Sequence, residues 1–132
     1  MTLRRARSIE IPGVHHGGAP IPMGARVGNT LYSSGIPGIN PESGELPVDP
    51  AEQAKFAFMN MRSLLNAGGA TLDDVVRVTV YLKDPSVREH VNGQWLMCFP
   101  DAKDRPARHT LNYDLQHGML LQIEVVAVIE SK

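Results

Sequence analysis

The chain has 132 residues, of which 13 are basic and 14 are acidic, so its formal net charge is −1. This length predicts a single domain over residues 1–132 with one ordinary core, and the balanced charge argues against nucleic-acid or membrane binding. The single cysteine excludes an internal disulfide and favours a reducing, cytoplasmic setting. No apolar run approaches the ~20 residues that span a bilayer, and the N-terminus lacks the apolar segment of a signal peptide. The only basic cluster, Arg4, Arg5 and Arg7, is expected to be a solvated chain end.

The first third of the chain predicts short strands and loops. Residues 1–14 are expected to form an N-terminal extension, with a short strand from Ser8 followed by a loop. Residues 25–33 predict a β-hairpin, because Gly28-Asn29 separates two β-prone stretches. Residues 35–44 contain too much glycine and proline for a regular element, so we expect a long structured loop.

The first helix has clear start and stop signals. Asp49 suits the N-cap, Pro50 suits the first helical position, and Glu52 follows in the first turn. Gly68-Gly69 predicts the end, because glycine accepts the left-handed conformation of a helix C-terminus. Between these limits, apolar residues recur at helical spacing and predict one buried stripe: Ala54, Ala57, Phe58, Met61, Leu64 and Leu65.

The second half predicts a strand, a helix and two further strands. Residues 75–82 form a strand that is expected to place four apolar side chains on one face: Val76, Val78, Val80 and Leu82. Asp84-Pro85 repeats the cap-and-proline signal, and the helix that it opens ends at Phe99-Pro100. The buried side of this helix is predicted to contain Val87, Val91, Trp95 and Cys98. Residues 107–112 and 120–129 are interpreted as the two strands of a final hairpin.

This order of elements predicts an α+β fold, with a mostly antiparallel sheet and two helices on one of its faces. Residues 120–129 are apolar on both faces of their strand, which is typical of a strand that is buried on both sides. Two helices cover only one side. We therefore expect another copy of the chain to cover the other side, which predicts a homo-oligomer with Gln122 near a subunit boundary.

Arg108 is the first candidate for a functional residue. Its planar guanidinium matches a carboxylate through two parallel, charge-assisted hydrogen bonds, so we predict that Arg108 holds the carboxylate of a small metabolite. The alternative is a structural ion pair. Thr110 shares the strand face of Arg108 by the two-residue period and is expected to line the same cleft.

Several motifs occur in a characteristic order: Ser34-Gly35, Asn40-Pro41-x-x-Gly44, Asp73 to Asp84, Val91-Asn92, Pro106-Ala107-Arg108 and Ile123-Glu124. With these motifs, residues from about 19 to 128 resemble the Rid/YjgF (reactive intermediate deaminase) family. The resemblance implies a chorismate-mutase-like fold and a homotrimer with three clefts between subunits. It also implies hydrolysis of 2-imino or 2-enamino acids to 2-oxo acids and ammonia, without a metal or organic cofactor.

Four positions carry over directly from the family pattern. The resemblance implies that Arg108 fixes the substrate carboxylate, that Ser34 and Gly35 line the cleft, and that Asn92 contributes from the second helix. Each has a plainer interpretation as well. Ser34 can simply end a strand, and Asn92 can be an amide on a helix surface.

Three positions depart from the family pattern. Ile21 stands where the family often has a tyrosine, Thr110 where it has a small thiol residue, and Gln122 where it has the glutamate that positions or activates water. Ile21 is still expected to contact substrate, and Gln122, Thr110 and Ser34 are the candidate catalytic residues. The amide of Gln122 can orient a water molecule, but it cannot take up a proton near neutral pH. General acid–base help is worth about 10²–10⁴-fold, so its loss would slow turnover without abolishing it.

The five histidines show no metal-ligand spacing, so no metal site is predicted: His15, His16, His90, His109 and His117. Histidine is the usual base near neutral pH. One hypothesis is that His15, His16 or His117 reaches an intersubunit cleft and replaces the missing glutamate. The alternative is that all three are ordinary loop or surface residues.

Two functions follow from this pattern. The first is an imine or enamine deaminase, or a relative that acts on another small unsaturated carboxylate. The second is a weakly catalytic or non-catalytic trimeric binding module for 2-oxo or related carboxylates. Ribonuclease activity finds no support, because the sequence has no basic stripe, no aromatic platform and no paired histidines for RNA cleavage.

Overall fold

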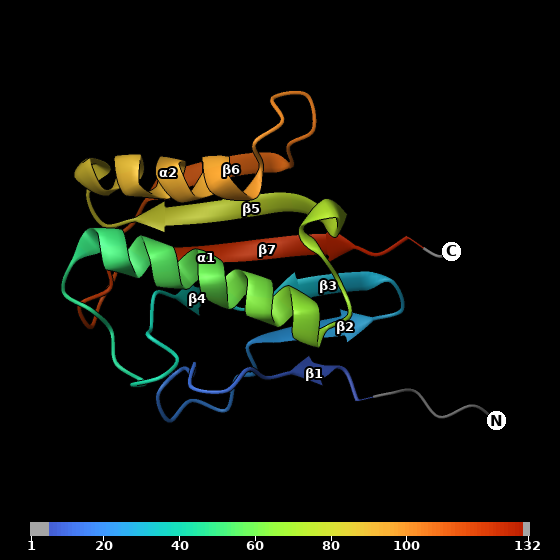
Figure 1. Ribbon diagram of the computed structural model, residues 1–132. Helices are drawn as coiled ribbons and strands as arrows, with labels where there is room; N and C mark the ends of the chain where they lie inside the picture. The colour runs from blue at the N-terminus through green and yellow to red at the C-terminus, as the bar shows by residue number, and fades with distance from the viewer. Residues whose placement is uncertain (1–5, 131–132) are drawn as a thin grey trace.

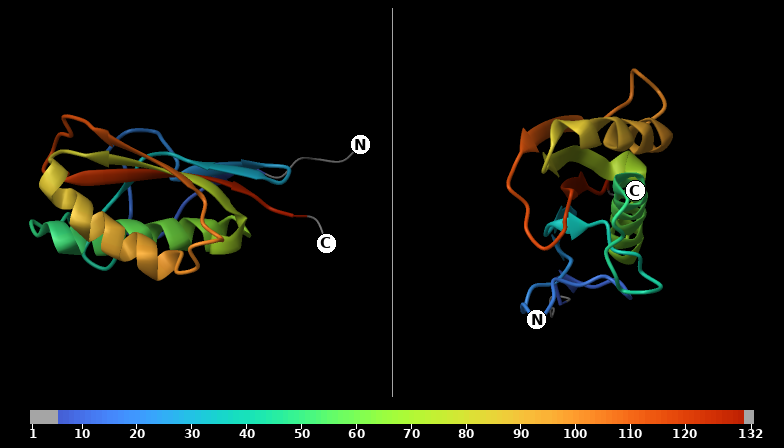
Figure 2. Two further views of the ribbon diagram at one scale, coloured as in Figure 1. Left: turned by 90° about the horizontal axis from the view of Figure 1, so that it is seen from above. Right: turned by 90° about the vertical axis from the view of Figure 1, so that its left-hand side faces the viewer.

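A computed structural model describes residues 6–130, so Arg4 and Arg5 of the basic cluster lie outside the described part. One seven-stranded sheet carries both helices on the same face (Figures 1 and 2). The strands are β1 (Ser8–Ile9), β2 (Gly24–Val27), β3 (Thr30–Ser33), β4 (Ile36–Pro37), β5 (Val75–Leu82), β6 (Ala107–Asn112) and β7 (Leu121–Val128). The helices are α1 (Pro50–Ala67) and α2 (Arg88–Cys98). A short 3₁₀ segment, Leu72–Asp74, follows α1, and another, Pro85–Val87, precedes α2. The predicted α+β fold is confirmed.

The sheet has the strand order β1-β2-β3-β7-β5-β6, and β4 also pairs with β7. All pairs are antiparallel except β5 and β6, which are parallel. The predicted final hairpin is therefore wrong, because β5 lies between β6 and β7. Parallel neighbours need a long crossover connection, and α2 supplies it between β5 and β6.

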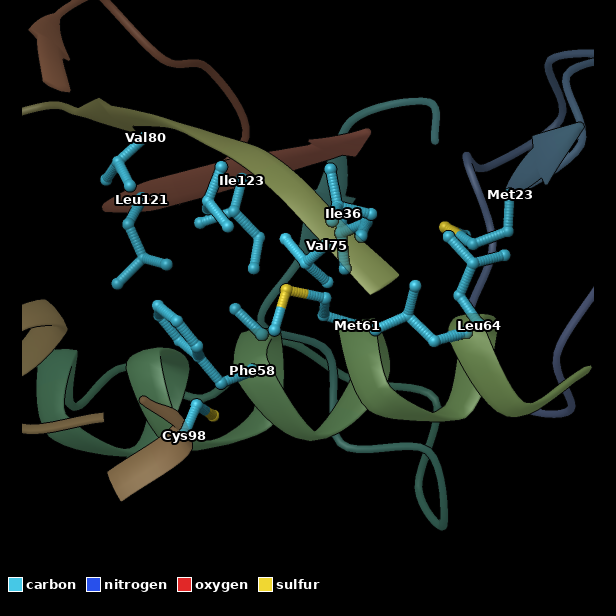
Figure 3. Close-up of a cluster of buried hydrophobic side chains, with 14 of the residues drawn as sticks. Met23, Ile36, Phe58, Met61, Leu64, Val75, Val80, Cys98, Leu121 and Ile123 are labelled. Carbon is cyan, nitrogen blue, oxygen red and sulfur yellow. The ribbon is translucent and has the colours of Figure 1, made fainter. Parts of the chain in front are cut away.

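Helix α1 forms as its end signals predict. The Asp49 side chain accepts a hydrogen bond from the Ala51 N–H at 3.2 Å, and Pro50 occupies the first turn. The helix ends at Gly68, and Gly69 follows with φ +82°. Figure 3 shows how its apolar stripe meets the sheet, with Phe58 and Met61 directed toward side chains of β5 and β7 and Leu64 directed toward Met23. The predicted stripe is fully buried.

Strand β5 departs from the predicted alternation at its first residues. Val75 is only 8% exposed, whereas Val76 is 51% exposed. A register shift between Val75 and Arg77 explains the difference, because one extra residue reverses the side of the sheet to which the preceding residue points. The prediction that Val76 lies in the core is wrong, while Val78, Val80 and Leu82 are buried as expected.

The predicted loop over residues 35–44 is more ordered than expected. It contains β4 and a β-bridge between Asn40 and Glu45. Asn60, buried on α1, donates hydrogen bonds to the carbonyl oxygens of Pro37 (3.0 Å) and Ile39 (2.9 Å). These two bonds attach the segment to the helix layer and hold Gly35 near β7.

The other face of the sheet is left open by the helices (Figure 2). Val126 is half-buried there, and Val128 and Tyr32 are exposed. Tyr81 and Glu124 are joined on this face by a hydrogen bond of 2.6 Å. Within residues 6–130, neither helix combines the length and the apolar character needed to cross a membrane.

Candidate active site

Arg108 lies on β6, the edge strand of the sheet, on the side that faces α2. Its Nε donates a hydrogen bond to Thr110 Oγ1 at 2.9 Å, so the two residues share a face as predicted. The Arg108 guanidinium carbon lies 5.3 Å from the centre of the Trp95 ring, a cation–π distance. Burial, and to a lesser extent the nearby Arg88 guanidinium, lowers the pKa of Arg108, but a guanidinium stays charged at neutral pH.

The charge of Arg108 is not balanced by a carboxylate within residues 6–130. The ion pairs in this part of the chain are Lys83 with Asp114 and His90 with Glu89. The Nε of Arg108 is used by Thr110, which leaves the two terminal nitrogens available for a ligand. The arrangement does not support the alternative of an internal ion pair for Arg108.

Helix α2 forms the other wall around Arg108. Asn92 is exposed and lies three residues before Trp95, so both occupy one face of the helix. Trp95 was predicted to be core, but it is half-buried and packs against both Phe99 and Arg108. The four residues Arg108, Thr110, Asn92 and Trp95 are called the Arg108 half-site below.

Gln122 and Gly35 lie on the open face of the sheet. Gln122 belongs to β7, where it is paired with Pro37 of β4 and Tyr81 of β5. A Cβ atom at Gly35 would lie 1.8 Å from Gln122 Nε2, so the amide can take this position only because residue 35 has no side chain. Both residues line a cavity of about 570 Å³.

The three histidines of the sequence hypothesis line this same cavity. His15 accepts a hydrogen bond from the Gly17 N–H at its Nδ1 (3.1 Å), and His16 donates from Nε2 to the Gly35 carbonyl (2.7 Å). His117 is exposed, and its ring has no hydrogen bond to the described residues. Its φ of +61° is in the left-handed region, which is uncommon for a residue other than glycine. Gly35, Gln122 and these three histidines are called the Gln122 half-site.

Two further candidates lie outside both half-sites. The Ser34 hydroxyl donates a hydrogen bond to the Pro22 carbonyl at 2.7 Å, which fixes its direction next to Gly35. Ile21 is 49% exposed and does not line the cavity that contains Gln122.

The two half-sites lie on opposite faces of the sheet in one protomer. Arg108 is paired with Val78, which is fully buried on the helix side. Gln122 lies between Leu121 and Ile123, which are also fully buried, so its own side chain points to the open face. A small molecule therefore cannot touch both Arg108 and Gln122 of the same chain.

Sequence reasoning placed Trp95 in the core and did not single out Arg88. The signal that could have found them is the spacing on α2, where Arg88, Asn92 and Trp95 recur at intervals of four and three. No group of three or more potential metal-ligating side chains gathers anywhere in residues 6–130.

Comparison with known proteins gives a consistent result. Residues 21–129 match the family model described as endoribonuclease L-PSP. A RutC family protein of Pyrococcus abyssi is 36% identical over 119 residues, covering 85% of this chain and 92% of that protein. A 2-iminobutanoate/2-iminopropanoate deaminase of Escherichia coli K12 is 32% identical over 111 residues, covering 83% of this chain and 87% of that protein.

Solved structures agree with the sequence relatives. The YjgF gene product of Escherichia coli superposes with a TM-score of 0.84 at 28% identity, covering 95% of this chain and 100% of that chain. Escherichia coli TdcF with bound serine has a TM-score of 0.84 at 25% identity, covering 94% and 99% of the two chains.

Proposed function

Because the chain belongs to the endoribonuclease L-PSP family, also called the YjgF or Rid family, we propose that it hydrolyses 2-imino or 2-enamino acids to 2-oxo acids and ammonia. The observation that carries this proposal is the half-buried Arg108, whose guanidinium has two terminal nitrogens available and no carboxylate partner within residues 6–130. The proposal needs no metal or organic cofactor. The serine bound to TdcF, an amino acid with a carboxylate, is consistent with this ligand class.

The active cleft in this proposal lies between two protomers of a homotrimer. One chain cannot bring its two half-sites together, since Arg108 and Gln122 point to opposite faces of the sheet. A neighbouring copy packed on the open face would supply the Arg108 half-site to the Gln122 half-site of the first. Burial of the apolar side chains that remain exposed on that face, such as Tyr32 and Val128, would favour such packing.

The chemistry requires a held substrate, a placed water and proton transfers from the water and to the nitrogen. Arg108 binds the substrate carboxylate, and Thr110 keeps the guanidinium in position. The water oxygen bonds to C2 of the protonated imine while one of its protons passes to a base. The base returns that proton to the nitrogen of the carbinolamine. The C–N bond then breaks, ammonia leaves, and the remaining hydroxyl gives its proton to solvent water, which leaves the 2-oxo acid.

We assign the orientation of the water to Gln122 and the proton transfer to His117. His117 lines the same cavity as Gln122, and its ring nitrogens form no hydrogen bond to the described residues. His15 and His16, the other titratable groups of that cavity, each use one ring nitrogen to hold backbone atoms of their own loop or of Gly35. The left-handed backbone of His117 is a further sign of a functional residue, because strained conformations concentrate at such sites.

An imine-decay assay tests the function. 2-Iminobutanoate generated in situ by an amino-acid oxidase should disappear faster in the presence of the protein. 2-Oxobutanoate should form at the same rate at which the imine disappears. If the imine decays at its spontaneous rate while 2-oxobutanoate binds in calorimetry, the protein is the binding module that the glutamine at position 122 also suggests. Failure of both acceleration and binding would reject both functions.

Mixed trimers test the shared cleft. The Arg108→Ala and Gly35→Ala variants damage different half-sites, because the new Cβ at residue 35 must displace the Gln122 amide. Each variant alone is expected to lose most of its activity. After the two are unfolded and refolded together in equal amounts, about a quarter of the clefts should combine two intact halves and regain activity. Mixed trimers that form without regaining activity would contradict the shared cleft.

A glutamate at position 122 should compensate for loss of the base. His117→Asn keeps a residue that tolerates the left-handed conformation, and we expect it to lower kcat/KM by about 10²-fold. The double variant His117→Asn/Gln122→Glu should have a kcat/KM at least tenfold higher than that of His117→Asn alone. An unchanged kcat/KM in His117→Asn would exclude His117 as the base.

A further inference from the structure

We propose that the substrate has an acidic side chain, so that it is a dicarboxylate, and that Arg88 binds its second carboxylate. This inference rests on the proposed function, because it concerns the same Arg108 half-site. It adds a specificity-determining residue and a substrate class to it.

The direction of the Arg108 side chain is the first observation. Its Nε bonds to Thr110, two residues further along β6, so the side chain runs toward the C-terminal end of that strand. Strands β5 and β6 are parallel, and α2 starts shortly after β5 ends (Figure 1). The guanidinium of Arg108 is therefore directed toward the end of the sheet at which α2 begins with Arg88.

The face of α2 that meets Arg108 is the second observation. Trp95 lies against the guanidinium of Arg108. Arg88 precedes Trp95 by seven residues and Asn92 precedes it by three, so all three share one face of the helix. Arg88 is thus about 10 Å before Trp95 along the helix axis, on the side toward which Arg108 points. The two guanidiniums are near enough that the charge of Arg88 lowers the pKa of Arg108.

The charge balance is the third observation. Arg88, like Arg108, takes part in neither of the ion pairs formed within residues 6–130. The nearest acidic residues along the chain are otherwise engaged, because Asp84 caps the Ser86 N–H at 2.9 Å and Glu89 lies 3.8 Å from His90. Two neighbouring positive charges without a carboxylate repel each other. A monocarboxylate would neutralise one of them, whereas a dicarboxylate would neutralise both.

A neutral side chain on the substrate would leave Arg88 without a partner, and an acidic one would gain a charge-assisted hydrogen bond. Such a bond is worth about 1.5–3 kcal/mol, which corresponds to roughly 10–100-fold in affinity or kcat/KM. We therefore expect the protein to prefer 2-iminosuccinate or 2-iminoglutarate over 2-iminobutanoate by this factor. We expect the same preference for 2-oxoglutarate over 2-oxobutanoate in binding.

The test compares these ligands in the assembled protein and in the variants Arg88→Met, Arg88→Lys and Arg62→Met. Arg88→Met keeps a long side chain without the charge. We expect it to lower affinity and kcat/KM by a factor that is at least ten times larger for the dicarboxylate than for the monocarboxylate. Arg88→Lys should recover part of the preference. Arg62 is exposed on α1 in the groove between the helices. Arg62→Met is therefore the matched control, and it should leave affinity and kcat/KM unchanged for both ligands.

Calorimetry with the two 2-oxo acids keeps this inference separate from the deaminase proposal, since binding needs no turnover. Preference for 2-oxoglutarate that depends on Arg88 supports the second carboxylate site even if no imine is hydrolysed. The second carboxylate site would be overturned if the unaltered protein bound both acids with equal affinity. It would also be overturned if Arg88→Met lowered the affinity for both acids equally. A change of oligomeric state in Arg88→Met would also overturn it, because Arg88 would then serve the contact between subunits.

Discussion

Replacing Arg108 by alanine is expected to lower kcat/KM for imine hydrolysis by about 10²–10⁴-fold. The substrate carboxylate would lose two charge-assisted hydrogen bonds, each worth about 1.5–3 kcal/mol. The loss is expected to exceed that of an exposed arginine because Arg108 is half-buried, where charges are screened less by water. Initial rates of 2-oxobutanoate formation at several substrate concentrations measure the effect.

Stability separates this role of Arg108 from a structural one. A half-buried guanidinium without a carboxylate partner in residues 6–130 contributes little to folding, so Arg108→Ala should not lower the thermal midpoint. Arg108→Lys keeps the charge but not the planar fork and should show an intermediate loss of rate. Arg62→Ala is the control for removing an exposed arginine. A large drop in stability in Arg108→Ala with unchanged kcat/KM would contradict carboxylate binding.

Replacing Gln53 by leucine is expected to destabilise the fold by about 3–5 kcal/mol. Gln53 is fully buried on α1, and its amide nitrogen donates to the carbonyl oxygens of Pro47 (2.7 Å) and Gly118 (3.1 Å). Its amide oxygen accepts from the Leu120 N–H at 2.9 Å. Leucine offers no partner to these three groups, two of which belong to the half-buried residues Pro47 and Leu120, and each polar group left unpaired away from water costs about 1–3 kcal/mol.

Urea unfolding at a fixed protein concentration measures this loss, since assembly would otherwise shift the midpoint. The corresponding fall in thermal midpoint is about 10–20 °C for a chain of this size. Gln94→Leu on α2 is the control, because this half-buried amide makes no hydrogen bond within the described residues, and it should stay within about 0.5 kcal/mol of the unaltered protein. A loss below about 1 kcal/mol in Gln53→Leu would show that these bonds are replaced by others.

Gln53 also connects the fold to the Gln122 half-site. The residues that it holds, Gly118 and Leu120, lie within the segment between His117 and Gln122. Any protein that stays folded after the Gln53→Leu substitution is therefore expected to lose activity as well. The buried amide of α1 thus orders the loop that carries the proposed base.

Local sequence was sufficient for the elements themselves. Asp49 and Gly68-Gly69 define the ends of α1 through hydrogen bonds and backbone conformations that depend only on near neighbours. The two-residue period of a strand likewise put Arg108 and Thr110 on one face. The α+β class and the one-sided helix layer follow from the order of these elements and the apolar pattern of β7.

The pairing of strands was decided by the tertiary structure. Residues 107–112 and 121–128 resemble a hairpin in sequence, yet β6 pairs with β5. Strand pairing depends on which distant segments can satisfy their hydrogen bonds and bury their apolar sides together, and local propensity does not contain this information. The bulge that turns Val76 outward has the same origin, because it is set by the register with β7.

The sequence by itself determined which residue types are available for chemistry: an arginine suited to a carboxylate, a glutamine in place of a glutamate, and histidines in flanking loops. Only the tertiary structure decided how they are grouped. It separates Arg108 from Gln122 by the thickness of the sheet, collects three histidines around Gln122, and directs Arg108 toward the end of α2 that carries Arg88. The physical reason is that these groupings depend on pleat, strand order and helix packing, which arise only when distant segments meet.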